Sequence, residues 1–77
     1  MDERDIRKTI AELVEREHRL RTGHELDDDR RRELAAIEAQ LDQCWDLLRQ
    51  RDALRDVGRD PGDARSRPVS QVESYLQ

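Results

Sequence analysis

A leucine repeated every seven residues is the feature that most constrains how this chain can fold. Leu34, Leu41 and Leu48 stand seven apart, and an apolar residue follows each of the first two by three positions. Because this spacing returns to one side of an α-helix, the side chains form a single apolar seam of the coiled-coil type. The seam consists of Leu34, Ile37, Leu41, Cys44 and Leu48. We therefore expect a long helix over about residues 28–57, with its seam buried against another helix.

Further apolar side chains widen this seam. Leu47 and Leu54 run along one flank, and Trp45, the only tryptophan, lies on the other. The next two seam positions are Arg51 and Arg55, so the seam turns polar near its end. A stripe this wide favours a helical bundle over a simple two-stranded zipper.

The residues before this helix predict a second helix over about 2–22. Its apolar residues recur mostly at spacings of three and four, as one helical face requires. They are Ile6, Ile10, Leu13, Val14 and Leu20. Gly23 supplies a helix stop, and Asp27 or Asp28 can cap the next helix. The short turn between them predicts an antiparallel two-helix hairpin.

The C-terminal part predicts a linker and a short third helix. Gly58 is expected to end the long helix, and the turn-rich "GRDPGDARSRP" forms a linker over residues 58–69. Ser70 and Glu73 fit a capping box for a helix over about 70–76, with Val72, Tyr75 and Leu76 on one face. The predicted fold is therefore all-α: a hairpin with a short C-terminal helical segment, in one domain over residues 1–77.

The two long helices differ in length, which leaves apolar residues without a partner. Helices of about 30 and 45 Å joined by a short turn overlap only over about residues 28–47 of the longer one. Leu48, Leu54, Val57 and one side of Trp45 are then uncovered. Either the C-terminal segment folds back over them or a second chain does.

Composition favours the second chain. Only 34% of the 77 residues are hydrophobic, and a core this small rarely stabilises a chain alone. One cysteine allows no internal disulfide, so we expect a homodimer that completes a helical bundle. The predicted interface residues are Leu41, Cys44, Trp45, Leu48, Leu54, Tyr75 and Leu76.

The setting is predicted to be the cytoplasm. The N-terminal "MDERDIRKTI" is charged and has no apolar run behind it, so no signal peptide is expected. No stretch approaches the ~20 apolar residues of a membrane span. A single thiol suits a reducing compartment.

Catalytic and metal chemistry find little support, so we expect no enzyme, no cofactor and no metal. Glu15 and His18 have the Glu-x-x-His spacing of ferritin-like metal bundles, but Glu15 points nearly opposite the apolar stripe. No Ser, His or Asp pattern in the sequence suggests a base that would activate the Cys44 thiol, and its position in the seam predicts an inert buried thiol. His24, in the turn, is most simply a solvated loop residue.

Glu17 occupies a seam position between Leu13 and Leu20. It can pair with Arg51 or Arg55 of a second chain and so set the register. The simpler reading is a carboxylate that reaches water from the edge of a loose bundle.

Six arginines over nineteen residues raise a nucleic-acid hypothesis. They are Arg49, Arg51, Arg55, Arg59, Arg65 and Arg67. Interleaved aspartates leave this stretch nearly neutral, the net charge of the chain is −4, and no aromatic residues alternate to stack on bases. Nucleic-acid binding is therefore the alternative, not the leading, interpretation.

The segments "LDQCWDLLRQR", "GRDPGDARSRPV" and "VESYLQ" resemble a family of small actinobacterial proteins known as domain of unknown function 2630. The resemblance covers nearly the whole chain and implies a helical fold and a bacterial cytoplasmic setting. It implies no activity and therefore no functional residues.

Together these observations predict a non-enzymatic helical protein-protein interaction module. Its partner is expected to be a second copy of the chain or another helical protein, and not a membrane. The alternatives are a nucleic-acid- or ribonucleoprotein-associated accessory protein and, less favoured, a small metal-binding helical bundle.

Overall fold

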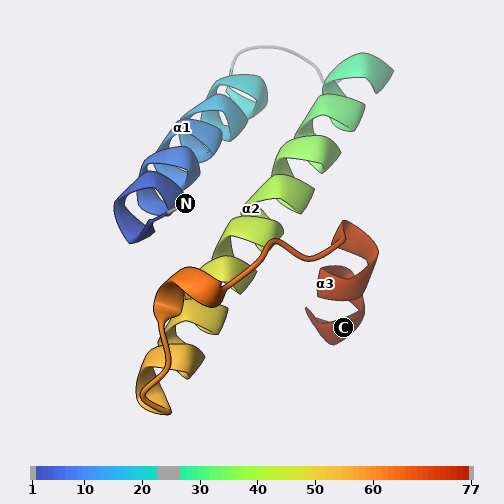
Figure 1. Cartoon of the computed structure of the whole chain (residues 1–77). Coiled ribbons are helices and arrows are strands. Elements are labelled where there is room, and N and C mark those ends of the chain that lie inside the picture. Colours follow the sequence, from blue (N-terminus) through green and yellow to red (C-terminus); the bar gives the residue numbers. More distant parts are fainter. Residues whose placement is uncertain (1, 23–26, 77) are drawn as a thin grey trace.

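A computed structural model describes residues 2–22 and 27–76, with side chains described up to residue 72. The helices are α1 (Glu3–Arg21), α2 (Asp28–Asp56) and α3 (Val69–Leu76), with one 3-10 turn, η1 (Pro61–Asp63). Within these residues no strand forms, and α1 and α2 run antiparallel as a hairpin (Figure 1). The predicted all-α hairpin with a short C-terminal helical segment is confirmed.

Aspartates begin both long helices. The Asp2 carboxylate accepts a hydrogen bond from the backbone N–H of Asp5 at 2.9 Å, and Asp27 accepts one from Arg30 at 2.8 Å. Each bond satisfies a backbone donor that the first helical turn leaves without a partner. Of the two caps considered for α2, Asp27 is the one used. Gly23 and His24 lie outside the described residues.

The hairpin core is the predicted seam packed against the α1 stripe. Seven buried side chains form it: Ile6, Ile10, Leu13, Ile37, Leu41, Cys44 and Leu48. Leu20 and Leu47 pack against its edge. Ion pairs join the helices, the two shortest being Arg16 to Glu33 at 2.9 Å and Arg21 to Glu38 at 2.6 Å.

The overlap of the helices is longer than their lengths alone suggested. Leu48 is 6% exposed and shares the core with Ile6, so the prediction that the hairpin leaves it uncovered is wrong. Glu3 even reaches Arg55, at 4.0 Å. The reason is the register of α1 against α2, in which Ile6 shares the core with Leu48.

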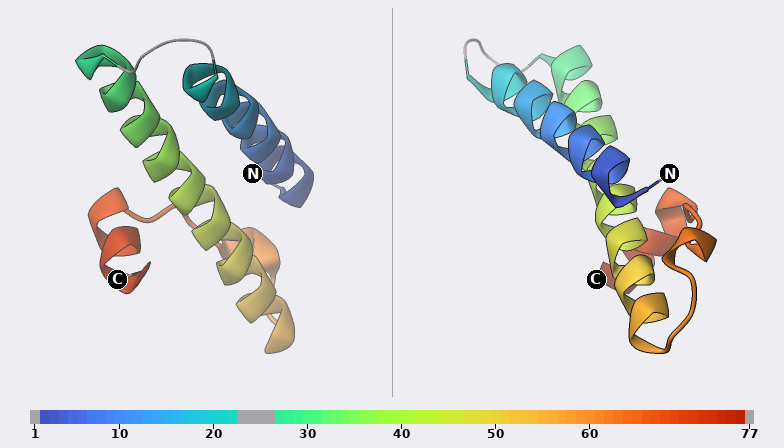
Figure 2. Two further views of the ribbon diagram at one scale, coloured as in Figure 1. Left: turned by 180° about the vertical axis from the view of Figure 1, so that it is seen from behind. Right: turned by 60° about the vertical axis from the view of Figure 1, so that its left-hand side comes forward.

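The chain after α2 turns back along it. Gly58 adopts a left-handed φ of 75°, which glycine accommodates without steric cost, and the linker then crosses one face of α2 (Figure 1). α3 lies beside the middle of α2, on the side away from α1 (Figure 2). Val72 is fully buried there. α2 is therefore the central element, with both ends of the chain packed on it.

One detail of α3 differs from prediction. The helix begins at Val69, so Ser70 lies inside its first turn and is not the N-cap. The Pro68 carbonyl already accepts from the N–H groups of Gln71 and Val72. Proline fixes the entry of the chain, and the proposed capping box is not formed by Ser70.

Candidate functional site

Three polar side chains of α2 hold the returning linker, and we call them the linker clamp: Gln43, Asp46 and Gln50. The Gln43 amide donates to the backbone carbonyl of Arg67 at 3.0 Å. The Gln50 amide donates to the carbonyl of Arg65 at 2.7 Å and accepts from its N–H at 3.3 Å. These side chains therefore bind the linker mainly through the backbone atoms of the linker.

Asp46 is the buried charge of the clamp. It is 2% exposed, and its Oδ2 atom accepts from the Gln50 amide at 2.9 Å and lies 3.4 Å from Nε of Arg67. A carboxylate without water needs such partners, since burying an uncompensated charge is costly. Sequence reasoning did not single out Asp46. The signal was the 43–46–50 spacing, which places three hydrogen-bonding side chains on one helical face.

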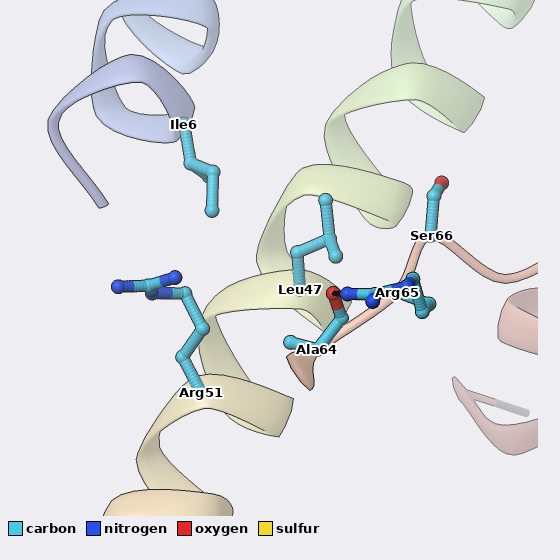
Figure 3. A pocket seen from close by; sticks show the side chains of 6 residues that line it. All are labelled: Ile6, Leu47, Arg51, Ala64, Arg65 and Ser66. Atoms are coloured by element: carbon cyan, nitrogen blue, oxygen red, sulfur yellow. Dashed lines mark hydrogen bonds between the residues drawn. The ribbon is translucent and has the colours of Figure 1, made fainter. Parts of the chain in front are cut away.

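A pocket of about 360 Å³ lies where the linker meets the hairpin (Figure 3). It is lined by Ile6, Leu47, Arg51, Ala64, Arg65 and Ser66. Arg51 donates to the carbonyl of Pro61 at 3.4 Å, and Arg65 donates to those of Gly62 and Ala64 at 2.9 and 3.0 Å. The guanidinium groups at this pocket therefore serve to fix the linker.

The opposite side of the hairpin exposes two apolar side chains, Val14 at 46% and Trp45 at 45%. Leu47 lines the pocket beneath the linker, and Trp45 comes two residues before it. Because successive residues of an α-helix are about 100° apart, Trp45 points about 200° away from Leu47, to the other side of α2. Seen from behind, the linker passes behind α2, and α1 and α3 flank the helix (Figure 2).

Val14 and Trp45 lie on the same side of the hairpin. The Arg21–Glu38 ion pair fixes one point on it. Val14 is seven residues before Arg21, and Trp45 is seven after Glu38, so each stands about 10 Å, two turns, from the pair on the same side of its helix. Because the helices are antiparallel, both steps go the same way.

Two further turns along are Arg7 and Asp52, whose side chains are 63% and 64% exposed. We call the whole surface the open face. It comprises Arg7, Val14, Arg21, Glu38, Trp45 and Asp52.

The predicted interface residues fall into different places. Leu41, Cys44 and Leu48 are buried in the hairpin's own core, and Leu54 is half-buried. Trp45 alone of the described set is exposed. The side chains of Tyr75 and Leu76 lie outside the described residues. Burial raises the pKa of the Cys44 thiol, because the apolar surroundings disfavour the thiolate.

Glu15 and His18, the pair that was weighed as a metal site and not favoured, have no further ligands gathered around them among the described residues. Glu15 and His18 are exposed, and no group of three His, Cys, Asp or Glu side chains comes together among the described residues. Glu17 is half-buried and lies 4.0 Å from Arg21 one turn on.

Four of the six arginines considered for nucleic acid are engaged within the chain. Arg51 and Arg65 hold linker carbonyls, Arg67 meets Asp46, and Arg55 pairs with Asp52 at 2.9 Å. Arg49 and Arg59 are exposed. Three of the six, Arg51, Arg65 and Arg67, therefore take part in attaching the linker. In the described part of the chain, no helix is long and apolar enough to cross a membrane.

Comparison with known proteins gives one family and several relatives. The family described as "Protein of unknown function (DUF2630)" matches residues 2–77. "Uncharacterized protein Mb0922c" of Mycobacterium bovis and "Uncharacterized protein Rv0898c" of Mycobacterium tuberculosis are each 49% identical over 70 residues, which cover 91% of this chain and 80% of theirs. No solved structure matches the chain.

Proposed function

The chain belongs to the DUF2630 family, and from that premise we propose that it is a non-enzymatic helical interaction module whose partner is a second copy of itself. The observation that carries the proposal is the exposure of both Trp45 and Val14 on one side of the hairpin. Large aromatic side chains contribute much of the binding energy where they are buried at an interface. An exposed tryptophan on a rigid helix is therefore a suitable anchor for a partner.

The small core supports the same proposal. Nine apolar side chains are buried among the described residues, and a core of that size gives a single chain only modest stability. Association that covers the open face would add to it. The proposal includes a cytoplasmic setting, supported by the single, buried Cys44, which needs no oxidising compartment.

Nucleic-acid association receives less support. Binding to a nucleic acid requires arginines that are free to contact phosphates. In this chain, four of the candidate arginines contact groups of their own chain instead: Arg51, Arg55, Arg65 and Arg67. Another helical protein remains the natural second partner for the open face, since the same apolar pair would suit it.

Sedimentation of the wild type over a hundredfold range of concentration tests the proposal. A dimer dissociates on dilution by mass action, and its thermal stability rises with concentration. Trp45→Ala should weaken association by at least ~2 kcal/mol. Val57→Ala is the matched control, because Val57 is 71% exposed but lies at the end of α2, away from the open face. A monomer at every concentration would refute the homodimer.

A further inference from the structure

We propose that the chain after Gly58 is an exchangeable arm, which can leave its own α2 and occupy the same site on α2 of a second copy. The arm comprises the described residues 59–76, which are the linker and α3. Two chains that exchange their arms form a domain-swapped dimer. This inference goes beyond the proposed homodimer, because it uses the linker clamp and not the open face.

The arm has hydrogen bonds of its own. The Asp60 carboxylate accepts from the N–H of Gly62 at 2.8 Å. The Pro68 carbonyl accepts from the N–H groups of Gln71 and Val72 at the start of α3. These bonds lie within the arm, so they move with it whichever chain it packs on.

The contacts that hold the arm come from α2. The linker clamp binds it through Gln43, Asp46 and Gln50, and Arg51 donates to the carbonyl of Pro61 at 3.4 Å. Among the described helices, α3 packs on α2 and not on α1 (Figure 2). A second copy presents the same groups on its own α2, so an exchanged arm makes the same contacts there. The occupant of the site is therefore the arm of a second copy.

One residue directs the arm back onto its own helix. Gly58 has a φ of 75°, and it alone among the described residues has a positive φ. Its N–H donates to the carbonyl of Arg55 at 3.1 Å, and the next N–H, of Arg59, donates to that of Leu54 at 2.7 Å. This pair of bonds is the Schellman motif, which ends a helix at a left-handed residue.

A change at Gly58 alone opens this turn. If Gly58 takes helical angles, α2 continues toward Pro61, before which helical angles are disfavoured. The arm is then carried beyond the end of its own α2, where it can dock on a second chain. The balance between the closed chain and the swapped dimer therefore depends on the backbone preference of position 58.

Gly58→Ala tests this dependence. A Cβ atom at Gly58 meets no heavy atom of the described residues within 4 Å, so the substitution acts through the backbone and not through a clash. Left-handed alanine is disfavoured by a factor of at least about five, and a swapped dimer relieves two such residues. Sedimentation should therefore show an association constant raised by about 25-fold. Gly58→Asn is the matched control and should stay nearer the wild type, because asparagine adopts left-handed angles more readily.

The ion pair between Asp46 and Arg67 reveals which chain supplies the arm, since Nε and Oδ2 are 3.4 Å apart. In the Gly58→Ala background, Asp46→Arg and Arg67→Asp each bring like charges together, both in the closed chain and in a swapped homodimer. In a swapped heterodimer the introduced arginine meets the introduced aspartate, and the natural pair forms at the other site. Native mass spectrometry of an equimolar mixture should then show about tenfold more heterodimer than either homodimer.

Two controls accompany the mixture. A chain that carries both Asp46→Arg and Arg67→Asp restores opposite charges within itself, so it should dimerise like the Gly58→Ala parent. Circular dichroism checks that each variant keeps its helices. Where a charge variant does not, the comparison of Gly58→Ala with Gly58→Asn decides by itself.

The outcomes separate this inference from the proposed homodimer. Stronger association of Gly58→Ala with selective heterodimers supports the swap. Charge variants that mix at random overturn it, because the arms then stay on their own chains. Association of Gly58→Ala no stronger than that of Gly58→Asn overturns it as well. A monomeric wild type beside a dimeric, selectively pairing Gly58→Ala removes the homodimer through the open face and supports the swap.

Discussion

Replacing Arg67 by alanine should loosen the C-terminal segment more than replacing its partner Asp46 does. The two side chains form one ion pair, with 3.4 Å between Nε and Oδ2, yet their surroundings differ. The Asp46 side chain is 2% exposed and that of Arg67 is 32% exposed. Without Arg67 a carboxylate stays buried, whereas without Asp46 the guanidinium turns toward water.

The magnitudes follow from this asymmetry. Removing one partner of a fully buried ion pair costs about 3–5 kcal/mol, because the other charge is left uncompensated. Asp46 keeps the Gln50 hydrogen bond at 2.9 Å, and the pair is partly solvated, so we expect about 2 kcal/mol for Arg67→Ala. Asp46→Ala should cost about 1 kcal/mol, the worth of ordinary hydrogen bonds. The double variant should resemble Asp46→Ala, since no buried charge remains.

Urea denaturation gives the free energy of unfolding for the wild type, both single variants and the double variant. Amide exchange in α3 reports loosening of that segment even where the hairpin stays folded. Equal costs for the two single variants would refute the reasoning. Additive costs in the double variant would do so too, since they would show that the two side chains act independently.

Two further predictions concern the core and the tail. Cys44 should react slowly with thiol reagents in native buffer and quickly in denaturant. Because burial raises its pKa, the folded chain keeps a proton that the unfolded chain loses, so stability should fall above the ordinary thiol pKa of about 8.5, and Cys44→Ala should remove this fall. Val72→Ala should speed amide exchange in α3 to the rate of residues 59–67; unchanged protection would show that Val72 does not anchor the tail.

The two long helices could be predicted because their signals are local. The heptad from Leu34 to Leu48 defines a face, and an aspartate in front of each helix satisfies its first backbone donors. The overlap could not be predicted as well. It depends on how Ile6 fits between side chains of α2, and that packing is not visible in the spacing of one helix.

The attachment of the C-terminal segment to α2 could not be predicted from the sequence, for a different reason. Gln43 and Gln50 bind backbone carbonyls 24 and 15 residues away, and such contacts leave no periodic pattern in the linker itself. The candidate site was anticipated in part. Trp45 was placed on the flank of the seam by its spacing, but its exposure depends on where the linker and α3 pack, which the spacing does not show.

The linker clamp also bears on how this chain can change during evolution. Gln43 and Gln50 bind main-chain atoms of Arg67 and Arg65, and every amino acid supplies a backbone carbonyl at such positions. Mutations in the linker therefore leave these two anchor points intact, unless they alter the path of the backbone. Mutations of the two glutamines remove them. Selection on the attachment should therefore fall on the α2 side chains and on Arg67, whose side chain pairs with Asp46, while the other linker positions held through their backbone are freer to change.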